Sequence, residues 1–318
     1  MSAKRRETIS VLVRTRNEAR HLPRLIEGLS QQASPPDEVV VVDSGSTDES
    51  VDIARAAGWK IVRIDPDEFT FGRSLNFGFE NCTSDRVVII SAHVYPTRSD
   101  FLEVISQRVS AAGETIAYGR QVGDHRTKFS EKILMSTWFP SERIPDQGHA
   151  FTNNANACVP RTLWEKLRYN ESLAGLEDID FSMRLLALGG TVVYEEEAEV
   201  VHVHEETYKT IQRRYKREAV AYKAIFPGER MSGLSAVRLA LKNVLRDMSQ
   251  ASRESLLVKV WASILLFRGA QFLGAWQGFR EIGNQDTELM QRMYHPQPVN
   301  LGITRDNVPG RIEYSDND

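Results

Sequence analysis

Two successive units of one pattern at the start of the chain restrict its fold more than any other feature. Residues 8–32, TISVLVRTRNEARHLPRLIEGLSQQ, contain an apolar strand, a polar turn and leucines at helical spacing, and residues 36–58 repeat that order. Further strands are expected at 59–64 and 85–93, with a short helix at 72–84 between them. Strands that alternate with helices of this length form a parallel sheet covered on both faces. We therefore expect an α/β fold with a mixed, mainly parallel sheet flanked by helices.

The rest of the chain shows fewer regular signals. We expect a strand in 116–121, a long loop over 136–157, a helix that Gly189 and Gly190 end, and two short strands within 191–206. A long basic helix should follow at roughly 206–225, and two amphipathic helices at 232–281. The pattern predicts three parts: an α/β domain at 1–228, a helical C-terminal appendage at 229–295 and a polar tail at 296–318.

Composition argues against several classes of protein. The formal charge of −3 gives no general reason to expect a nucleic-acid partner. Cys82 and Cys158 lie far apart in apolar surroundings, which suits buried thiols in a reducing compartment. The first ten residues, MSAKRRETIS, lack the apolar core of a signal peptide, and no uncharged apolar run reaches the ~18 residues of a spanning helix. We expect a cytoplasmic protein without a membrane-spanning helix.

Polar side chains follow three of the expected strands. These segments are Arg14–Glu18, Asp43–Asp48 and Ser91–His93. In parallel sheets ligands bind at the carboxyl ends of strands, so the three segments should converge on one crevice. There the Asp43 carboxylate could accept a hydrogen bond from a nucleobase or a ribose. Ser46 or Asp48 could equally do no more than cap the following helix.

An acidic pair precedes a helix in GLEDIDFSMRLLALG. One of two adjacent carboxylates at a pocket edge can have its pKa raised by the other, so Glu177 or Asp178 could act as a general base. The alternative is an acidic first helical turn that the helix dipole favours. Arg184 follows on the same helix. Spacing alone does not decide between the two.

Two histidines and a basic helix come next. His202 and His204 stand at i and i+2 on an expected strand and point to one face, either as metal ligands or as structural residues. After them, basic residues recur at i, i+4 and i+8. This stripe consists of Lys209, Arg213 and Arg217, with Arg214 and Lys216 beside it. It is either a solvated helix face or a set of cations that neutralises a diphosphate.

Together these motifs resemble the family 2 glycosyltransferases, which have the GT-A fold. The resemblance covers about residues 8–225 and rests on the order of VRTRNE, VVVDSGSTD, SAH, GLED and HVH. It implies a nucleotide-diphosphate sugar as donor, usually inversion at the anomeric carbon, Asp43 on the nucleobase and Asp178 as the base. FTFGRSLNFG, YGRQ and FTNNANA are similar to a bacterial rhamnosyltransferase-like subgroup that makes polysaccharides.

The resemblance extends to individual residues. The residues expected to bind the nucleotide sugar are Arg14, Arg16, Glu18, Asp43, Ser46, Arg73, Asn76, Ser91, Ala92, His93, Arg213 and Arg214. Asn154, Asn156 and Trp138 are the candidates for contact with the acceptor, although the asparagines could satisfy a buried loop and Trp138 could belong to the core. The expected acceptor is a saccharide or a lipid-linked saccharide.

One motif departs from the family. Where its members carry a metal-binding Asp-x-Asp, this chain has Ser91-Ala92-His93. His93 could replace the last aspartate and bind a metal with His202 or His204, and such a site would favour Mn²⁺ over Mg²⁺. Alternatively, no metal binds, and the arginines of the basic helix stabilise the departing diphosphate. In a third alternative the protein is a catalytically silent nucleotide-sugar-binding subunit of a glycan assembly complex, although the retained GLED argues against this.

Two further alternatives concern the reaction and the appendage. Synthesis of the nucleotide sugar would need a glycine-rich, lysine-bearing triphosphate loop near the first strand, and VRTRNEARHL contains no glycine. Residues 232–281 are apolar enough to be buried against the catalytic domain or in a homodimer. Shallow docking on the inner face of a membrane, where a lipid-linked acceptor lies, is the other alternative.

Overall fold

The computed structural model describes residues 6–142, 144, 147–281 and 310–314, and within these residues eight strands form one mixed sheet. The strands are β1 (Ile9–Thr15), β2 (Glu38–Asp43), β3 (Lys60–Arg63), β4 (Arg86–Ser91), β5 (Val94–Pro96), β6 (Thr115–Val122), β7 (Asn156–Pro160) and β8 (Thr191–His202). Their order in the sheet is β3-β2-β1-β4-β7-β6-β8-β5. The four strands from β3 to β4 are parallel, as the alternation of strands and helices predicts.

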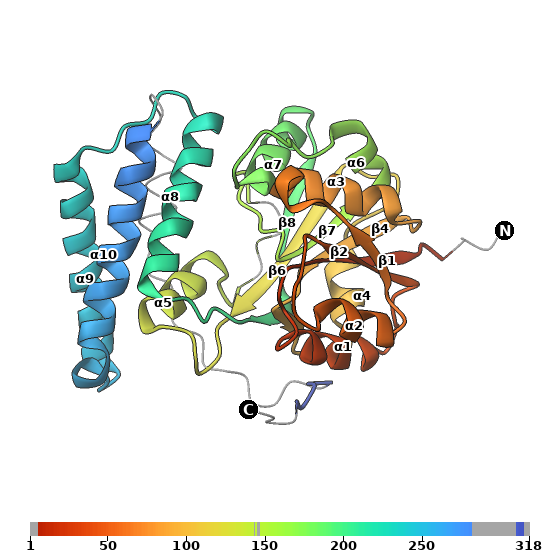
Figure 1. Ribbon diagram of the computed structural model, residues 1–318, viewed down its shortest axis with the longest axis horizontal. Coiled ribbons are helices and arrows are strands. Elements are labelled where there is room, and N and C mark those ends of the chain that lie inside the picture. The colour runs from red at the N-terminus through yellow and green to blue at the C-terminus, as the bar shows by residue number, and fades with distance from the viewer. Residues whose placement is uncertain (1–5, 143, 145–146, 282–309, 315–318) are drawn as a thin grey trace.

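Helices cover both faces of the sheet, and three further helices stand beside it (Figure 1). They are α1 (Leu22–Ser30), α2 (Ser50–Ala56), α3 (Phe71–Asn81), α4 (Phe101–Ser106), α5 (Phe129–Trp138), α6 (Arg161–Leu167), α7 (Glu177–Ala187), α8 (Tyr208–Ile225), α9 (Gly233–Arg253) and α10 (Leu257–Glu281), with a 3₁₀ turn at Pro66–Glu68. The expected α/β class with a helical C-terminal appendage is confirmed.

The apolar strands divide their side chains between two cores. In β1, Val11 and Val13 face the core beneath α1, α2 and α4, whereas Leu12 faces the core beneath α3, α6 and α7. This division follows from the twofold period of a strand, and it explains why β1, β2 and β4 are continuous apolar runs. Cys82 and Cys158 are buried free thiols, as expected.

The second half differs from the sequence prediction in several elements. Residues 191–202 form the single strand β8 rather than two short strands, and its pairing with β6 shifts register between Gly119 and Gln121. Pro96 lies in β5, an edge strand of the sheet, where a residue without a backbone N–H is tolerated. Helices α4, α5 and α6 were not predicted. Each is only 6 to 10 residues long, which is too short to show a clear helical period.

The appendage joins the α/β domain through a shared core. Ile211 and Tyr215 of α8 pack with Phe267 and Phe272 of α10, and the same cluster includes Ile179 of α7. Two glycines bring α10 close to α8, since a Cβ on Gly274 or Gly278 would lie 2.2 or 2.3 Å from a carbonyl oxygen of α8. The predicted boundary at 228 remains a prediction. The predicted parts beyond residue 281 lie outside the described residues, except for 310–314.

Residues 310–314 lie beside strand β5. The amide of Ile312 donates to the carbonyl of Thr97 at 2.9 Å, the amide of Ser99 donates to the carbonyl of Gly310 at 2.8 Å, and Arg98 forms an antiparallel bridge with Arg311. The ring of Tyr314 packs edge-on against that of Tyr95. This part of the predicted polar tail therefore returns to the edge of the sheet.

The close approach of α10 to α8 predicts opposite effects for two alanine substitutions. Gly274→Ala should lower the free energy of unfolding by about 1–3 kcal/mol, because its Cβ would collide with the Gln212 carbonyl. On the same helix, a Cβ added at Gly269 would have no heavy atom within 4 Å. Gly269→Ala should therefore raise the free energy of unfolding by about 0.5–1 kcal/mol through helix propensity alone. Urea denaturation followed by circular dichroism measures both. Equal effects of the two substitutions would contradict the close contact.

Candidate active site

The ends of β1, β2 and β4 lie side by side at one edge of the sheet, and we call the region that their loops border the crevice. The backbone amide of Asn17 donates to Ser46 Oγ at 2.9 Å, and that of Glu18 donates to Ser50 Oγ at 2.7 Å. Thus the loop after β1 is tied to the turn after β2. The loop after β4 joins them, because the amide of Ala92 donates to the Arg14 carbonyl at 3.3 Å. The structure therefore brings together the three polar segments singled out in the sequence.

Asp43 is the last residue of β2 and lies among these strand ends. Its side chain is buried, and Oδ1 accepts a hydrogen bond from the amide of Ser46 at 3.1 Å. Gly45 follows with a φ of +86°, a conformation that favours glycine and makes the turn possible. The N-cap position of α2 is Glu49, which makes no capping bond with its side chain, but Asp48 before it accepts from the amide and the hydroxyl of Ser50. A carboxylate in such a socket has a second oxygen with which to bind a ligand.

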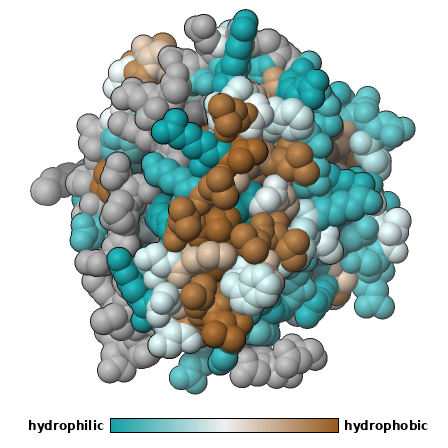
Figure 2. Space-filling model, turned by 90° about the vertical axis from the view of Figure 1, so that its left-hand side faces the viewer, coloured by the Kyte–Doolittle hydropathy of each residue, from teal (hydrophilic) through white to brown (hydrophobic). Residues whose placement is uncertain are grey.

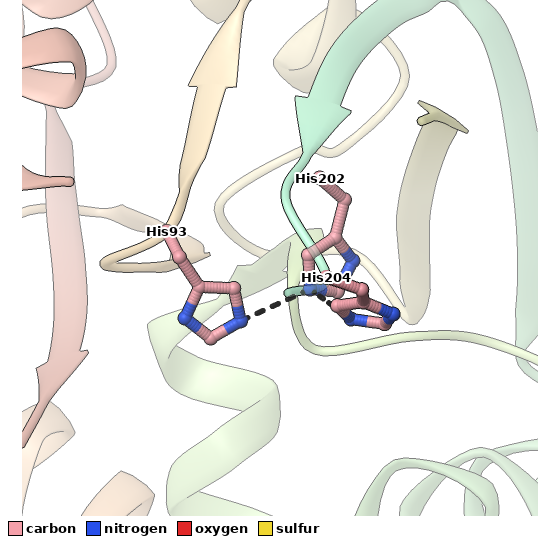
Figure 3. A group of neighbouring side chains, drawn as sticks. All are labelled: His93, His202 and His204. Atoms are coloured by element: carbon pink, nitrogen blue, oxygen red, sulfur yellow. Dashed lines mark hydrogen bonds between the residues drawn. The ribbon is translucent and has the colours of Figure 1, made fainter. Parts of the chain in front are cut away.

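Three histidines meet at the edge of the crevice (Figure 3). His93 follows β4, and His202 and His204 stand at and just after the end of β8. Nε2 of His202 lies 3.1 Å from Nε2 of His93 and 2.8 Å from Nε2 of His204. Residues 109 positions apart in the sequence thus place three ring nitrogens around one point.

The opposite nitrogen of each ring has an oxygen partner. Nδ1 of His93 lies 2.8 Å from a carboxylate oxygen of Glu18, Nδ1 of His202 lies 2.6 Å from Oε1 of Gln121, and Nδ1 of His204 lies 2.7 Å from a carboxylate oxygen of Glu131. Because these oxygens accept hydrogen bonds, each Nδ1 can donate to its partner, and in that tautomer each Nε2 directs a lone pair at the other two rings. Three lone pairs this close repel one another unless a cation lies between them. Imidazoles oriented through Nδ1 by carboxylates are a common arrangement at metal sites.

Burial keeps the central imidazole neutral. Desolvation, followed by the neighbouring His204 and His93, lowers the pKa of His202 well below its usual value. A neutral ring is the form that binds a metal, so the environment favours the ligand state. The residues present therefore fit a divalent cation with open positions for other ligands, which suits a catalytic rather than a closed structural site.

Glu131 links the histidines to the basic helix. Burial raises the pKa of Glu131, but the guanidinium of Arg214 and the hydrogen-bonded neighbour His204 lower it to about 2. Arg214 lies 2.6 Å from Glu131 and 2.8 Å from Glu206. It is therefore a partner of these carboxylates, and its Nη1 also approaches His204 Nδ1 at 3.2 Å. Glu131, His204 and Glu206 could geometrically hold a second cation, but the Arg214 guanidinium already neutralises that group.

The acidic pair begins α7, as the GLED motif suggested. Burial, and then the charge of Glu177, raise the pKa of Asp178 to about 7. Glu177 Oε1 lies 3.3 Å from Arg14 and accepts from Asn154 Nδ2 at 3.3 Å. The backbone amides of Ile179 and Asn154 donate to Asp178 at 2.9 and 3.4 Å. The two carboxylates thus differ in role: Glu177 is ion-paired, whereas Asp178 can take up a proton near neutral pH.

Unusual backbone conformations position these side chains. Leu176, directly before the acidic pair, has a φ of +56°, and so does Asn17 in the loop after β1. The left-handed region costs a residue other than glycine roughly 1–2 kcal/mol, so the surrounding structure must hold both conformations in place. Backbone strain of this kind is concentrated at functional sites.

Phe71 lies between two arginines at the same crevice. The guanidinium of Arg14 lies 5.2 Å from the centroid of its ring and that of Arg217 lies 4.8 Å from it. Phe71 begins α3, Arg14 stands in β1 and Arg217 stands on α8, so this contact joins the basic helix to the strand ends. The stripe that continues to exposed Arg213 therefore faces the crevice rather than only solvent.

Other predicted residues have different partners. Asn76 is buried, and its amide bonds the carbonyl of Tyr169, the Glu171 side chain and the Trp164 indole. Asn156 is buried and donates to the carbonyls of Arg120 and Ala198, which is the loop-satisfying alternative. Trp138 packs beside the core. Arg73 forms an ion pair with Glu68, and Arg16 is exposed.

Sequence reasoning missed three residues of the site. Gln121 and Glu131 orient the histidines, and Phe71 lies between the arginines. Gln121 and Phe71 stood in segments that contributed to the family resemblance, so a signal was present. Glu131 lies on the unpredicted helix α5, and no pattern around it distinguished it from a surface acid.

The sequence has recognisable relatives. Residues 10–162 match the model of a family described as Glycosyl transferase family 2. The chain is 24% identical over 220 residues to the O-antigen chain rhamnosyltransferase RfbN of Salmonella typhimurium, an alignment that covers 65% of this chain and 70% of RfbN. It is 25% identical over 199 residues to the O-antigen chain rhamnosyltransferase WbaN of Salmonella anatum, which covers 58% of this chain and 62% of WbaN.

Solved structures share the fold. The mannosyltransferase PcManGT from Pyrobaculum calidifontis, solved with GDP-Man and Mn²⁺, superposes with a TM-score of 0.57 at 17% identity over 87% of this chain and 88% of that one. Glucosyl-3-phosphoglycerate synthase from Mycobacterium tuberculosis, solved with UDP, gives a TM-score of 0.50 at 18% identity over 69% of this chain and 80% of that one. The GT-A fold that the sequence resemblance implied is confirmed.

Proposed function

We propose that this chain is a family 2 glycosyltransferase of polysaccharide synthesis that transfers a deoxyhexose such as rhamnose from a nucleotide-sugar donor to an acceptor hydroxyl, since residues 10–162 match the model of that family. The observation that carries the proposal is the acidic pair of buried Glu177 and half-buried Asp178, held beside Arg14 in the crevice that the histidines border. The choice of rhamnose is supported by the names of the relatives RfbN and WbaN. A saccharide or a lipid-linked saccharide is the proposed acceptor.

The proposed reaction is a single in-line displacement. Asp178 takes the proton of the acceptor hydroxyl while its oxygen attacks the anomeric carbon, and the bond from that carbon to the diphosphate breaks as the diphosphate takes the electron pair. Such a displacement inverts the configuration at this carbon. A base is most effective when its pKa lies near the working pH, and burial provides this for Asp178. Glu177, paired with Arg14, raises that pKa and holds the first turn of α7 in place.

The nucleotide half of the donor is proposed to bind at the ends of β1 and β2. Asp43 would accept from the base or the ribose, and the amides near Ser46 would line the socket. The diphosphate would then lie between the three histidines and the exposed arginines of α8, Arg213 and Arg217. Arg14 and Phe71 would border the sugar on the side of Asp178.

His93, His202 and His204 are proposed to hold a divalent cation, Mn²⁺ in preference to Mg²⁺. Nitrogen ligands suit Mn²⁺ and later transition metals, whereas Mg²⁺ prefers oxygens. Bound there, the cation would supply positive charge that stabilises the diphosphate as it leaves. The imidazole of His93 would thus provide the ligand that the missing Asp-x-Asp provides in other members of the family.

A panel of donors tests the proposal. UDP-, GDP- and dTDP-linked sugars are incubated with the full chain in EDTA, Mg²⁺ or Mn²⁺, and free nucleoside diphosphate is measured. We expect release from one donor, a deoxyhexose, and faster release with Mn²⁺ than with Mg²⁺. Release that survives EDTA would refute the metal assignment and shift the stabilisation to the α8 arginines. Donor binding without release, even with saccharide acceptors added, would instead favour the silent binding subunit.

A further inference from the structure

The outer face of the appendage exposes more apolar surface than its packing explains. On α9, Leu234, Val237, Leu241 and Leu245 are 57 to 81% exposed, and their spacing places them on one side of the helix. The neighbouring helix α10 exposes Val258, Trp261, Leu265, Leu266 and Leu273. Figure 2 shows the apolar residues as one continuous band on the side of the molecule formed by these helices. Scattered exposed leucines are ordinary, but a continuous patch marks an interaction surface.

The charge beside this patch is positive. Arg238 and Lys242 of α9 are exposed, and so is Lys259 near the start of α10. The acid within α9, Asp247, is fully buried in an ion pair with Arg268 at 2.7 Å. The acid within α10, Glu281, stands at the end of that helix and pairs with Lys216 at 2.5 Å. Exposed Glu254 caps α9 and accepts a hydrogen bond from Gln250, so the central part of the patch combines apolar side chains with cations.

The patch does not mark a membrane-spanning helix. Among the described residues α10 is long and apolar enough to cross a bilayer, but length and composition alone are weak support, and 33% of that segment is buried. Arg268 lies in its middle, fully buried against Asp247 of α9. Gly274 and Gly278 hold the same helix against the backbone of α8. A spanning helix would have to abandon all of these contacts.

A second copy of the chain fits the patch less well than a lipid surface does. A twofold dimer places the same patch against itself, so the cations of one copy would face apolar groups or cations of the other. The exposed acids at the ends of these helices, Glu254 and Glu281, are already bonded to Gln250 and Lys216 and lie away from the middle of the patch in sequence, so they do not balance Arg238 and Lys242. Like charges brought together in an interface are unfavourable.

We infer that α9 and α10 form a surface that docks shallowly on an anionic lipid bilayer. The leucines and Trp261 would enter the boundary between headgroups and acyl chains, while the long basic side chains reach the lipid phosphates. The inference goes beyond the proposed function, because lipid binding requires no sugar donor. Docking would also orient the crevice relative to the bilayer. Helix α10 packs on α8, and Arg217 of α8 contacts Phe71 in the crevice, so the docked appendage would hold the crevice in a fixed position.

Sedimentation with vesicles tests this inference on the full chain. The two vesicles are phosphatidylcholine alone and phosphatidylcholine mixed with an equal part of phosphatidylglycerol. We expect binding to the mixed vesicles that weakens as salt is added. The double variant Arg238→Gln, Lys242→Gln should bind about thirtyfold more weakly, since each basic residue near an anionic surface contributes about fivefold. The double variant Leu241→Gln, Leu245→Gln should lose at least about tenfold through its apolar contribution.

Matched variants on other surfaces control for general effects of composition. Leu188→Gln removes an exposed leucine after α7, and Arg6→Gln with Arg55→Gln removes two exposed cations from the α/β domain. Both should bind vesicles normally. Binding to neither vesicle, or equal binding by all variants, would overturn the inference. The inference would also be overturned if light scattering showed a dimer that the variant Leu241→Gln, Leu245→Gln dissociates and the unmodified chain bound no vesicles. If the chain binds vesicles but transfers no sugar, the proposed function is contradicted and the lipid-docking inference is not.

Discussion

Replacement of Asp178 by asparagine is expected to lower the turnover number about 10²- to 10⁴-fold, the usual contribution of a positioned general base, while donor binding persists. Asparagine keeps the shape of the side chain and can still bond the amides of Ile179 and Asn154, but it cannot take the proton of an acceptor hydroxyl. Single-turnover rates with donor and acceptor, together with calorimetric binding of the donor, separate the two effects.

The pH profile gives the same assignment a second readout. Burial and Glu177 raise the pKa of Asp178 to about 7, and the base must be deprotonated to act. For the unmodified protein, kcat/KM should therefore rise with pH up to about 7 and level off above it. In Glu177→Gln the charge that contributes to the raised pKa is gone, so the rise should move to lower pH. A profile that stays at the same pH in this variant would contradict the coupling.

Asp180→Asn is the matched control for the base. Asp180 lies on the same helix and forms an ion pair with Arg184 at 2.8 Å, so its loss affects α7 without touching the crevice pair. This variant should retain turnover. If Asp178→Asn kept full turnover while Glu177→Gln lost it, the base would be Glu177 instead.

The strand ends could be predicted from the sequence because their signals are local. The valines and isoleucines of β1, β2 and β4 show buried strands, and the polar residues after each strand lie at the same edge because parallel strands have the same direction. Asp43 was identified in this way, whereas Asp178 was identified from the acidic pair that begins a helix. Only the family resemblance, however, connected them to sugar transfer.

The remaining parts of the site depend on contacts between residues distant in the sequence. His93 and His202 are 109 residues apart, and the sequence left their meeting as one of three alternatives. Glu131 contacts His204 from a helix of only 10 residues that has no marked period. Asn76 and Asn156 were candidates for ligand contact because they lie in segments that resemble the family, FTFGRSLNFG and FTNNANA. Their partners are backbone carbonyls and side chains inside the fold, which no local pattern reveals.

Loss of one histidine should abolish tight metal binding. His93→Ala removes one of three nitrogens, and we expect the affinity for Mn²⁺ to fall by more than about a hundredfold, since removing even an orienting partner of a ligand costs 10- to 100-fold. Gln121→Leu keeps all three imidazoles but removes the hydrogen-bond partner of His202 Nδ1. Its affinity for Mn²⁺ should therefore fall by only about 10- to 100-fold. Electron paramagnetic resonance of free Mn²⁺ measures both affinities without any sugar donor.

His21→Ala is the control for this experiment. Its ring centroid lies 6.3 Å from that of His93 in the same crevice, yet the ring lies outside the group of nitrogens that could hold a cation. Its affinity for Mn²⁺ should match that of the unmodified protein. Equal Mn²⁺ binding by His93→Ala and His21→Ala would exclude the histidine site. Diphosphate release in EDTA would then be expected to depend on Arg213 and Arg217, because Arg214 is already held by Glu131 and Glu206. The two outcomes therefore assign the charge that stabilises the leaving group to different elements of the fold: the ends of β4 and β8, or helix α8.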